Sequence, residues 1–359
     1  MRTVLFVGGG TAGHVEPALA VAREWRSRYP SDRCIFLGTT EGLEAHLVPA
    51  AHFELRTIPK VVPPRRLQPG IFTFPFRLAA AYSATQKHLR DVDLMIGFGG
   101  YVSAPAYVAA AVRRIPYVIH EANAKPGWAN RLGARFTRYT ATAQPVTSTR
   151  FVDALITGIP LRSDVQSTLD HTTDWAIARM SAKRELGFPE NEKLIVVLGG
   201  SQGSVALNQT ITQSLGAFAA RNINLFHSCG ARNTLPEPGY HYRPVHYINE
   251  MARAYLAADV IIARSGAITC SEVNALGRYA LFIPLPVGNG EQEVNANHLI
   301  AQSRAEVIAQ SRFTPEWIAT NLDRLLERSA ASSIEGSYSD HDAARKIANF
   351  MEYAWEQGR

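Results

Sequence analysis

Short apolar runs alternate with longer amphipathic segments along the whole chain. The apolar runs, predicted as strands, are Thr3–Val7, Cys34–Leu37, Leu55–Ile58, Leu94–Ile96, Tyr117–His120, Tyr139–Thr142, Leu194–Leu198, Leu225–Ser228, Val260–Ala263 and Ala280–Ile283. The amphipathic segments, predicted as helices, are Glu16–Arg28, Ile71–Arg90, Ala104–Arg113, Val205–Ala220, Met251–Ala257, Thr269–Leu276 and Gln292–Gln302. Because strands that alternate with helices form parallel sheets, this order predicts the α/β class.

The 359 residues are enough for two domains. We interpret residues 157–160, Thr-Gly-Ile-Pro, as a linker, and a polar stretch at 163–174 follows it. We therefore expect a first domain at 1–160 and a second at 161–342. A last predicted helix at about 343–359 is expected to pack back on the first domain.

Three of the predicted strands lead into a glycine-containing loop and then a helix. The loops are Gly8–His14, Gly199–Gly203 and Arg264–Thr269, in the last of which Ser265 is predicted as the helix N-cap. The N-terminus of a helix offers unpaired N–H groups to an anion. Three such sites at the ends of parallel strands predict a protein that binds phosphates.

The first loop also satisfies the G-x-G-x-x-G pattern of nicotinamide enzymes. That function needs an acidic residue at the end of the second strand, where this chain has Gly38-Thr39-Thr40. A nicotinamide oxidoreductase would also leave the other two loops unexplained, so the pattern favours a tight strand–helix turn.

Charge is unequal between the two halves. Residues 1–160 carry 19 Lys and Arg against 10 Asp and Glu, whereas residues 161–359 carry 18 against 21. A basic first half indicates an anionic partner, but the basic residues form no helix stripe or nucleic-acid motif. No apolar run reaches the roughly 18 residues that span a bilayer, and three scattered cysteines fit a reducing compartment.

Seven ordered segments resemble the MurG family of N-acetylglucosamine transferases. They are GGGTAGHVEPALAVA from Gly8, GFGGYVSAPA from Gly97, HEANAKPGWANR from His120, TGIPLR from Thr157, GGSQGSVALN from Gly199, ARSGAITCSEVNALG from Ala263 and PLPVGNGEQEVNA from Pro284. The resemblance implies the GT-B architecture, in which two Rossmann-like domains with parallel sheets face each other across a cleft. It implies an inverting enzyme that moves GlcNAc from UDP-GlcNAc to lipid I, the undecaprenyl-pyrophosphoryl-MurNAc-pentapeptide, through a β-1,4 bond to give lipid II.

The same resemblance assigns the catalytic residues. His14 is implied as the base for the acceptor hydroxyl or as a diphosphate contact, against the alternative of a histidine that only orders its loop. Glu121 is a second candidate base, against the alternative of a carboxylate paired with His120 or an arginine. Gly10, Gly99, Gly100 and Tyr101 are implied to hold the acceptor diphosphate.

The resemblance also implies the contacts with UDP-GlcNAc. They are Thr11, Ala12, Gly13, Asn123, Arg162, Ser201, Gln202, Ile248, Ser265, Gly266, Ala267, Ile268, Thr269, Glu272, Glu291 and Gln292, with Asn130 as a weaker candidate. Glu272 is assigned to the ribose hydroxyls and Ile248 to uracil through its backbone. The chain departs from the family pattern at Ala122 and Glu291, where glutamine is usual. GT-B chemistry implies no required cofactor and no catalytic or structural metal.

An aromatic stretch in the basic half predicts a membrane contact. Ile71, Phe72, Phe74 and Phe76 are flanked by Arg65, Arg66 and Arg77, the composition of an interfacial anchor beside a basic patch. The alternative is that these aromatic side chains pack under a loop. The resemblance implies a bacterial cytoplasmic protein, peripheral on the inner leaflet of the cell membrane, with anionic lipid and other cell-wall synthesis proteins as partners.

Two other enzyme classes of the same fold are alternatives. One is a GT-B transferase with a different lipid or small-molecule acceptor, which would share the donor motifs but not the segments at His120 and Gly97. The other is a UDP-GlcNAc epimerase, which would consume the donor without any acceptor.

Overall fold

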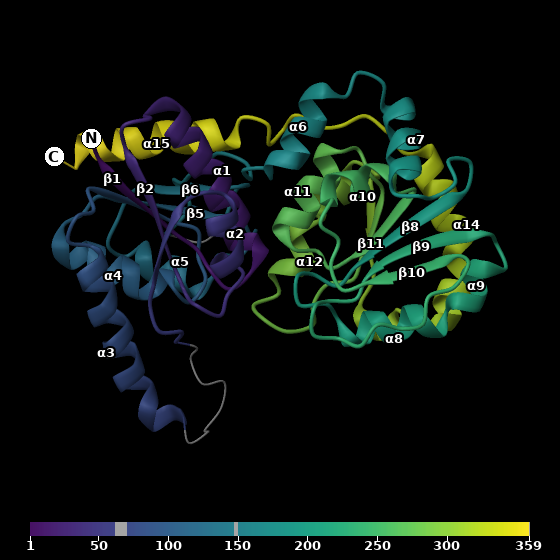
Figure 1. Ribbon diagram of the computed structural model, residues 1–359, viewed down its shortest axis with the longest axis horizontal. Coiled ribbons are helices and arrows are strands. Elements are labelled where there is room, and N and C mark those ends of the chain that lie inside the picture. Colours follow the sequence, from purple (N-terminus) through teal and green to yellow (C-terminus); the bar gives the residue numbers. More distant parts are fainter. Residues whose placement is uncertain (62–69, 147–149, 359) are drawn as a thin grey trace. The chain divides into compact units, whose positions relative to one another are not determined.

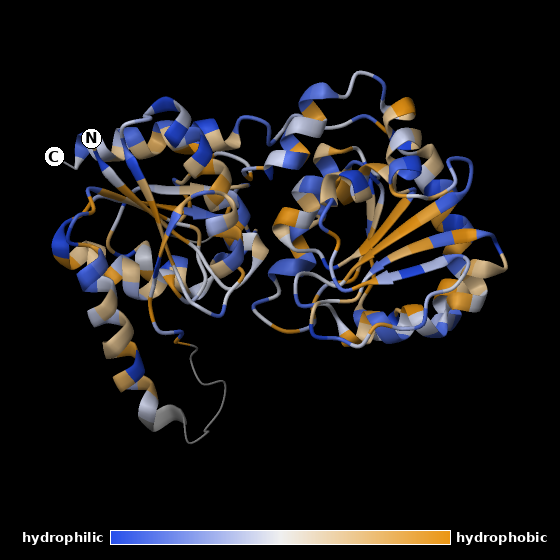
Figure 2. Ribbon diagram, in the orientation of Figure 1, coloured by the Kyte–Doolittle hydropathy of each residue, from blue (hydrophilic) through white to orange (hydrophobic). Residues whose placement is uncertain are grey.

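The computed structural model describes residues 1–61, 70–146 and 150–358, with side chains omitted at 70–72. The chain divides into two compact units, residues 1–162 with 340–359, and residues 163–339 (Figure 1). The predicted boundary after residue 160 differs from this division by two residues. In each unit a parallel sheet carries helices, and most strands are hydrophobic (Figure 2).

The first unit contains a parallel sheet of seven strands in the order β3-β2-β1-β4-β5-β6-β7. The strands are β1 (Thr3–Val7), β2 (Arg33–Gly38), β3 (Glu54–Thr57), β4 (Leu94–Gly97), β5 (Tyr117–Glu121), β6 (Thr140–Thr142) and β7 (Leu155–Ile156). The helices are α1 (Ala12–Arg28), α2 (Glu44–Ala50), α3 (Gly70–His88), α4 (Ser103–Arg113), α5 (Trp128–Gly133) and α15 (Ala343–Gln357).

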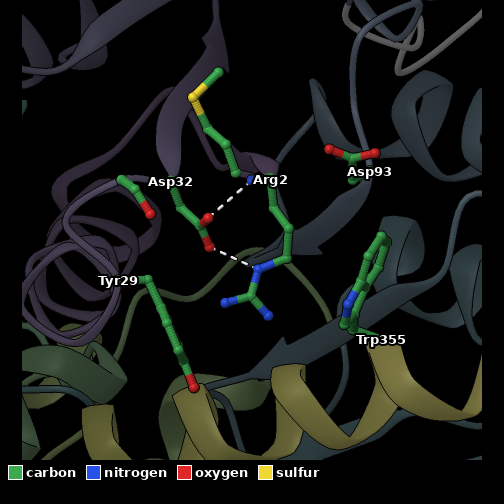
Figure 3. Close-up of a pocket in the computed structure, with 7 residues that line it drawn as sticks. Arg2, Tyr29, Asp32, Asp93 and Trp355 are labelled. Carbon is green, nitrogen blue, oxygen red and sulfur yellow. Dashed lines mark hydrogen bonds and ion pairs between the residues drawn. The ribbon is translucent and has the colours of Figure 1, made fainter.

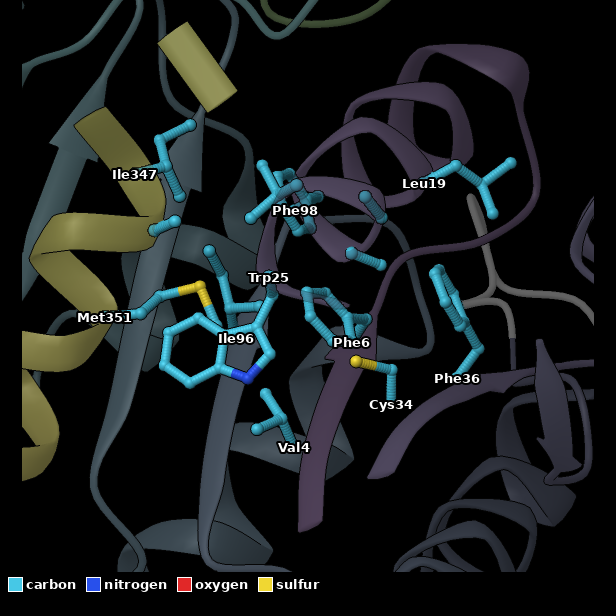
Figure 4. Close-up of a cluster of buried hydrophobic side chains, with 14 of the residues drawn as sticks. Val4, Phe6, Leu19, Trp25, Cys34, Phe36, Ile96, Phe98, Ile347 and Met351 are labelled. Atoms are coloured by element: carbon cyan, nitrogen blue, oxygen red, sulfur yellow. The ribbon is translucent and has the colours of Figure 1, made fainter. Parts of the chain in front are cut away.

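Alternation along β1 builds two cores on the opposite faces of this sheet. Val4 and Phe6 point to one face, where Trp25 of α1 and Met351 of α15 join them (Figure 4). Leu5 points to the other face, which α3 and α4 cover. The buried contacts of α15 mean that the last helix belongs to the first unit.

The second unit repeats this plan with a parallel sheet in the order β10-β9-β8-β11-β12-β13. The strands are β8 (Lys193–Leu198), β9 (Ile223–Ser228), β10 (Tyr242–Val245), β11 (Val260–Ala263), β12 (Ala280–Phe282) and β13 (Ala305–Val307). The helices are α6 (Ser163–His171), α7 (Trp175–Glu185), α8 (Val205–Gln213), α9 (Leu215–Ala219), α10 (Met251–Ala257), α11 (Ala267–Ala275), α12 (Glu291–Asn295), α13 (Asn297–Ala301) and α14 (Pro315–Ala331).

Two expectations about helices are wrong, and one helix was not predicted. The polar stretch at 163–174 contains the unpredicted α6, whose Val165 and Leu169 are one turn apart and both buried. The predicted helix at 205–220 is interrupted at Ser214, whose hydroxyl donates to a carbonyl in the preceding turn. The predicted helix at 292–302 is likewise two short helices.

Strand order reverses beside the first strand of each sheet, between β1 and β4 and between β8 and β11. In open parallel sheets, ligands bind at this reversal, outside the carboxyl ends of the strands. The loops that follow β1, β4, β8 and β11 are therefore where a site is expected, and they include all three glycine loops singled out in the sequence.

Candidate active site

Two glycine loops meet at the strand reversal of the first unit. One follows β1 at Gly8–Gly10, and the other follows β4 at residues 98–102. Gly99 and Gly100 have φ of +92° and +84°. A Cβ atom on Gly100 would lie 2.6 Å from the Gly9 carbonyl oxygen, so the close approach of the two loops depends on glycine there.

His14 lies in the first turn of α1, with Nδ1 3.1 Å from the Gly9 carbonyl oxygen and 3.1 Å from Thr11 Oγ1. Because a carbonyl oxygen only accepts hydrogen bonds, we assign the ring proton to Nδ1 and the lone pair to Nε2. Burial lowers the pKa of His14, and the Glu121 charge, the Gly9 bond and the Glu44 charge oppose that effect. The ring is therefore neutral near pH 7, and Nε2 can accept a proton from a hydroxyl group.

Glu121 at the end of β5 is buried and has both carboxylate oxygens engaged. Oε1 accepts from the backbone and side-chain amides of Asn123 at 2.9 and 3.0 Å. Oε2 accepts from the Gly127 backbone N–H and the Asn130 side-chain amide, each at 2.9 Å. Four hydrogen bonds occupy the acceptor sites of a carboxylate. This geometry suits a residue that holds the loop after β5 in place, and it does not suit a residue that transfers protons.

The alternative pairing of Glu121 with His120 is wrong. His120 Nε2 lies 3.0 Å from the Gly158 carbonyl oxygen, to which it donates. Burial lowers the pKa of His120 to about 4, so its ring is a neutral part of the core beside Phe98.

Gly10, which is expected at the acceptor diphosphate, is exposed. Its N–H donates to Glu44 Oε2 at 2.8 Å and is thereby committed within the protein. Among the other residues expected at this diphosphate, Tyr101 is 37% exposed and its ring centroid lies 6.2 Å from that of Trp128. A Cβ atom on Gly99 would lie 3.5 Å from His14 Nε2, so glycine leaves space beside that nitrogen.

Arg162 is the last residue of the first unit before α6. Its Nη1 lies 3.7 Å from Glu16 Oε1 in α1, and the two side chains are largely buried. The guanidinium therefore lies against the helix that carries His14. Ala12 and Gly13, in the same helix, are half-buried.

The loop after β8 carries two serines, of which only Ser201 is a predicted site residue. Ser201 and Gln202 lie in the turn, and α8 begins only at Val205. The N-cap of α8 is Ser204, whose hydroxyl accepts the Leu207 N–H at 3.4 Å. Ser204 was not among the predicted site residues, although a serine directly before a helical segment is a typical N-cap.

The prediction of Ser265 as the N-cap of α11 is wrong. Gly266 is the N-cap, in an extended conformation with φ −65° and ψ 143°. The Ser265 hydroxyl instead donates to the Gln292 carbonyl oxygen at 2.7 Å, and the Ser265 carbonyl accepts from the Asn295 side chain at 3.1 Å. Ser265 thus joins the loop after β11 to α12.

Other residues expected at the donor sugar and nucleoside take varied positions in the second unit. Glu272 on α11 and Ile248 are buried, at 3% and 2% exposure, so the alternative of a solvent-facing Glu272 is wrong. Gln292 Oε1 accepts the Leu285 N–H at 3.1 Å. The remaining residues expected to contact the donor are Ala267, which is buried, and Ile268, Thr269 and Glu291, which are half-buried.

Arg264 was not predicted as a site residue, yet it connects the loops of the second unit. Its guanidinium donates to Ser204 Oγ (2.7 Å), to the carbonyl oxygens of Ile283 and Pro284 (3.0 and 3.1 Å) and to Gln310 Oε1 (2.6 Å). The residue is 8% exposed, and its bonds within the described chain are to uncharged groups. A buried cation at the strand reversal is chemically suited to an anionic ligand.

The predicted membrane stretch is only partly described. Arg65 and Arg66 lie outside the described residues, as do the side chains of Ile71 and Phe72. Phe74 packs partly against the core of the first unit. For this residue the structure agrees with the alternative that the aromatic side chains are packed inside the protein.

The next turn of α3 is open to solvent. Phe76 is 77% exposed and Leu78 is 39% exposed, while Arg77 donates to the Lys60 carbonyl oxygen at 2.9 Å. Within the described parts of the chain, no helix is both long and apolar enough to cross a membrane.

Metal-binding side chains do not cluster in the described residues, where no group of three or more His, Cys, Asp or Glu is placed to hold an ion. Residues 91–93 read Asp-Val-Asp, so the sequence does contain an Asp-x-Asp triplet. Asp91 pairs with Arg56 at 2.6 Å, and Asp93 accepts the Thr3 N–H at 2.8 Å.

A pocket of about 430 Å³ in the first unit is separate from these loops (Figure 3). It is lined by Met1, Arg2, Tyr29, Ser31, Asp32, Asp93 and Trp355. Arg2, Asp32 and Asp93 precede β1, β2 and β4, so the pocket lies at the amino ends of the strands, opposite to His14.

Comparison with known families covers both units. The glycosyltransferase family 28 N-terminal domain matches residues 4–142, and the glycosyltransferase family 28 C-terminal domain matches residues 194–350. The chain is 43% identical to the UDP-N-acetylglucosamine–N-acetylmuramyl-(pentapeptide) pyrophosphoryl-undecaprenol N-acetylglucosamine transferase of Frankia casuarinae, with 99% of this chain and 96% of that protein covered.

Solved structures agree on the fold. The crystal structure of Acinetobacter baumannii MurG is 26% identical, with a TM-score of 0.70 and coverage of 98% of this chain and 100% of that one. A UDP-GlcNAc 2-epimerase from Neisseria meningitidis shares the two-domain GT-B fold at 14% identity and a TM-score of 0.65, covering 98% of this chain and 100% of that one. Fold alone therefore does not separate transferase from epimerase, but the full-length identity does: the chain belongs to glycosyltransferase family 28 and, within it, to the MurG family.

Proposed function

We propose that this protein transfers GlcNAc from UDP-GlcNAc to the muramyl sugar of undecaprenyl-pyrophosphoryl-MurNAc-pentapeptide, forming a β-1,4 bond with inversion at the anomeric carbon. The observation that carries the proposal is the 43% identity, over nearly the whole of both chains, to a relative named for this transfer. A neutral histidine at the strand reversal of the first unit supports it.

In the proposed reaction, His14 Nε2 accepts the proton of the acceptor hydroxyl. The hydroxyl oxygen forms a bond to the anomeric carbon from the side opposite UDP, and the bond from that carbon to the diphosphate oxygen breaks, leaving its electron pair on UDP. Throughout the reaction the Nδ1–H group keeps its proton and donates a hydrogen bond to the Gly9 carbonyl oxygen. This hydrogen bond orients the ring.

The charge that develops on the departing diphosphate needs stabilisation. We assign this task to the N-termini of α8 and α11, to Ser201 and Gln202 in the loop before α8, to Gly266–Thr269 at the start of α11, and to the charge of Arg264. Glu291 and Gln292 are proposed to contact the sugar, Ile248 the uracil, and Arg162, Asn123 and Thr11–Gly13 the donor from the first unit. The two helix N-termini and Arg264 supply the positive charge that a metal ion would otherwise provide. We therefore propose transfer without a metal, so EDTA should leave the rate unchanged.

Glu272 is proposed to accept hydrogen bonds from the ribose hydroxyls, since a carboxylate offers two oxygens to a vicinal diol. Glu272→Ala should weaken UDP binding by about 10–100-fold, the loss expected for hydrogen bonds to a charged group. Calorimetric titration with UDP and 2′-deoxy-UDP measures this. The wild-type protein should discriminate between the two ligands, and the variant should not.

The exposed Glu237 in the same unit provides the control, because Glu237→Ala should preserve both the affinity and the discrimination. A Glu272→Ala protein that still prefers UDP to 2′-deoxy-UDP would assign the ribose contact to another residue.

We also propose that the open turn of α3 contacts an anionic membrane, which would place the protein on the cytoplasmic face. Phe76→Ser combined with Leu78→Ser should weaken binding to vesicles containing anionic lipid by about tenfold or more, the effect of removing one to two buried apolar side chains. Vesicle sedimentation at low and high salt measures this.

The matched control is Val205→Ser, which removes a side chain 59% exposed in the second unit. Vesicle binding that is equal in all three proteins would exclude α3 as the contact.

The proposed transfer is tested by its product. Incubation with labelled UDP-GlcNAc and a short-chain lipid-linked muramyl-pentapeptide should move the label into the lipid fraction, with the sugar released by a β-specific N-acetylglucosaminidase. Label that stays in water-soluble sugar would contradict the proposal.

A further inference from the structure

Glu44 is a buried carboxylate for which the proposed reaction so far has no use. It is the first residue of α2 and is 0% exposed. Its Oε2 accepts the Gly10 N–H at 2.8 Å, and its Oε1 accepts the N–H and the hydroxyl of Thr39, both at 2.8 Å. One side chain thus joins the loop after β1 to the loop after β2.

Three glycines make room for this side chain. A Cβ atom on Gly9 would lie 2.7 Å from Glu44 Oε1, one on Gly42 would lie 2.1 Å from Oε2, and one on Gly38 would lie 2.4 Å from Cγ. Cβ atoms essentially never come so close to other heavy atoms, so all three positions need glycine while Glu44 occupies this space.

The bonds of Glu44 are all to uncharged donors, and no cation pairs with it in the described part of the chain. Burying a carboxylate without a cation is unfavourable unless its hydrogen bonds compensate. A neutral side chain could fill the same space without this cost. We therefore attribute the choice of a carboxylate to the hydrogen bond by which it holds the loop after β1.

We propose that Glu44 is a positioning residue for the transfer reaction, because its carboxylate fixes Gly10 and thereby the two groups that orient His14. Gly10 lies between Gly9, whose carbonyl oxygen receives the His14 Nδ1 proton, and Thr11, whose hydroxyl lies 3.1 Å from the same nitrogen. A displaced Gly10 would turn Nε2 away from the acceptor hydroxyl. This inference rests on the proposed function.

Charge adds a second effect. The charged groups that act on His14 are Glu121 at the end of β5 and Glu44 at the start of α2. Gly99 and Gly100 of the loop after β4 also lie next to the ring, and they carry no charge. Both carboxylates favour the imidazolium that forms when His14 takes a proton, and both raise its pKa.

The test compares Glu44→Gln, Glu44→Asp and the control Glu41→Gln by kcat, KM and pH profile. Glu44→Gln should lower kcat by about 30–100-fold, since a misplacement of about 1 Å costs about 10²-fold, while the KM for UDP-GlcNAc changes less than about threefold. The acid limb of the pH–rate profile of Glu44→Gln should move to lower pH, because this variant lacks a negative charge that raises the pKa of His14. Glu44→Asp keeps the charge, so its limb should stay in place while kcat falls. Glu41, whose side chain is 69% exposed, should tolerate the change.

Hydrogen exchange gives a readout that needs no activity. The Gly10 amide should exchange faster in Glu44→Gln than in the wild-type protein, at unchanged exchange in the second unit. If the wild-type protein transfers GlcNAc but Glu44→Gln retains both its kcat and its acid limb, the positioning role is overturned. If the wild-type protein does not transfer GlcNAc, the proposed function fails, and with it the catalytic meaning of Glu44.

Discussion

Replacement of His14 by alanine should lower kcat by about 10²–10⁴-fold, the contribution that a general base makes. His14 is partly buried beside Gly99, and its Nδ1 proton is held by Gly9, so Nε2 has the lone pair needed to take the acceptor proton. UDP affinity of the second unit should be unchanged, because His14 lies in the first unit. Steady-state kinetics at saturating acceptor, together with UDP titration, measures both quantities.

His46→Ala is the matched control, since His46 is exposed on α2 of the same unit and should be replaceable without effect. A His14→Ala protein with more than about a tenth of the wild-type kcat would assign the base to another group.

Replacement of Glu121 by alanine should destabilise the first unit by about 3 kcal/mol or more. The change would leave the Gly127 N–H and the amide groups of Asn123 and Asn130 without their acceptor, and each buried unsatisfied group costs about 1–3 kcal/mol. Urea unfolding followed by a probe in the first unit measures the loss.

The control is Glu54→Ala, because Glu54 is a half-exposed partner of Arg33 and Arg56 in the same sheet. Removal of such a surface pair should cost less than about 1 kcal/mol. A Glu121→Ala protein that is as stable as Glu54→Ala but inactive would contradict the structural role and restore Glu121 as a candidate base.

Much of the fold could be predicted because the core strands are continuous apolar runs between loops. The run Thr3–Val7 and the segment Met251–Ala257 have the bounds that were expected. The edge strands β7, β10 and β13 escaped prediction, since they are short and partly exposed and therefore lack such a run. α2 was missed because it has only seven residues.

The site could be predicted where its chemistry is local in sequence. The glycine loops and His14 can be identified from short motifs of neighbouring residues. Glu44 reaches Gly10 across 34 positions, and Arg264 reaches Gln310 across 46. Such contacts exist only after the parallel sheet brings distant loops to one edge, so no motif marks them. Ser265 was misassigned as a cap for the same reason, since its acceptor, Gln292, is 27 positions away.

The most direct test of the central claim is UDP release from UDP-GlcNAc by the purified protein, measured with and without the lipid-linked muramyl-pentapeptide. The account predicts release that depends on the acceptor, persists in EDTA and is nearly lost in His14→Ala. UDP release at the same rate without acceptor would contradict it and would indicate a hydrolysing epimerase.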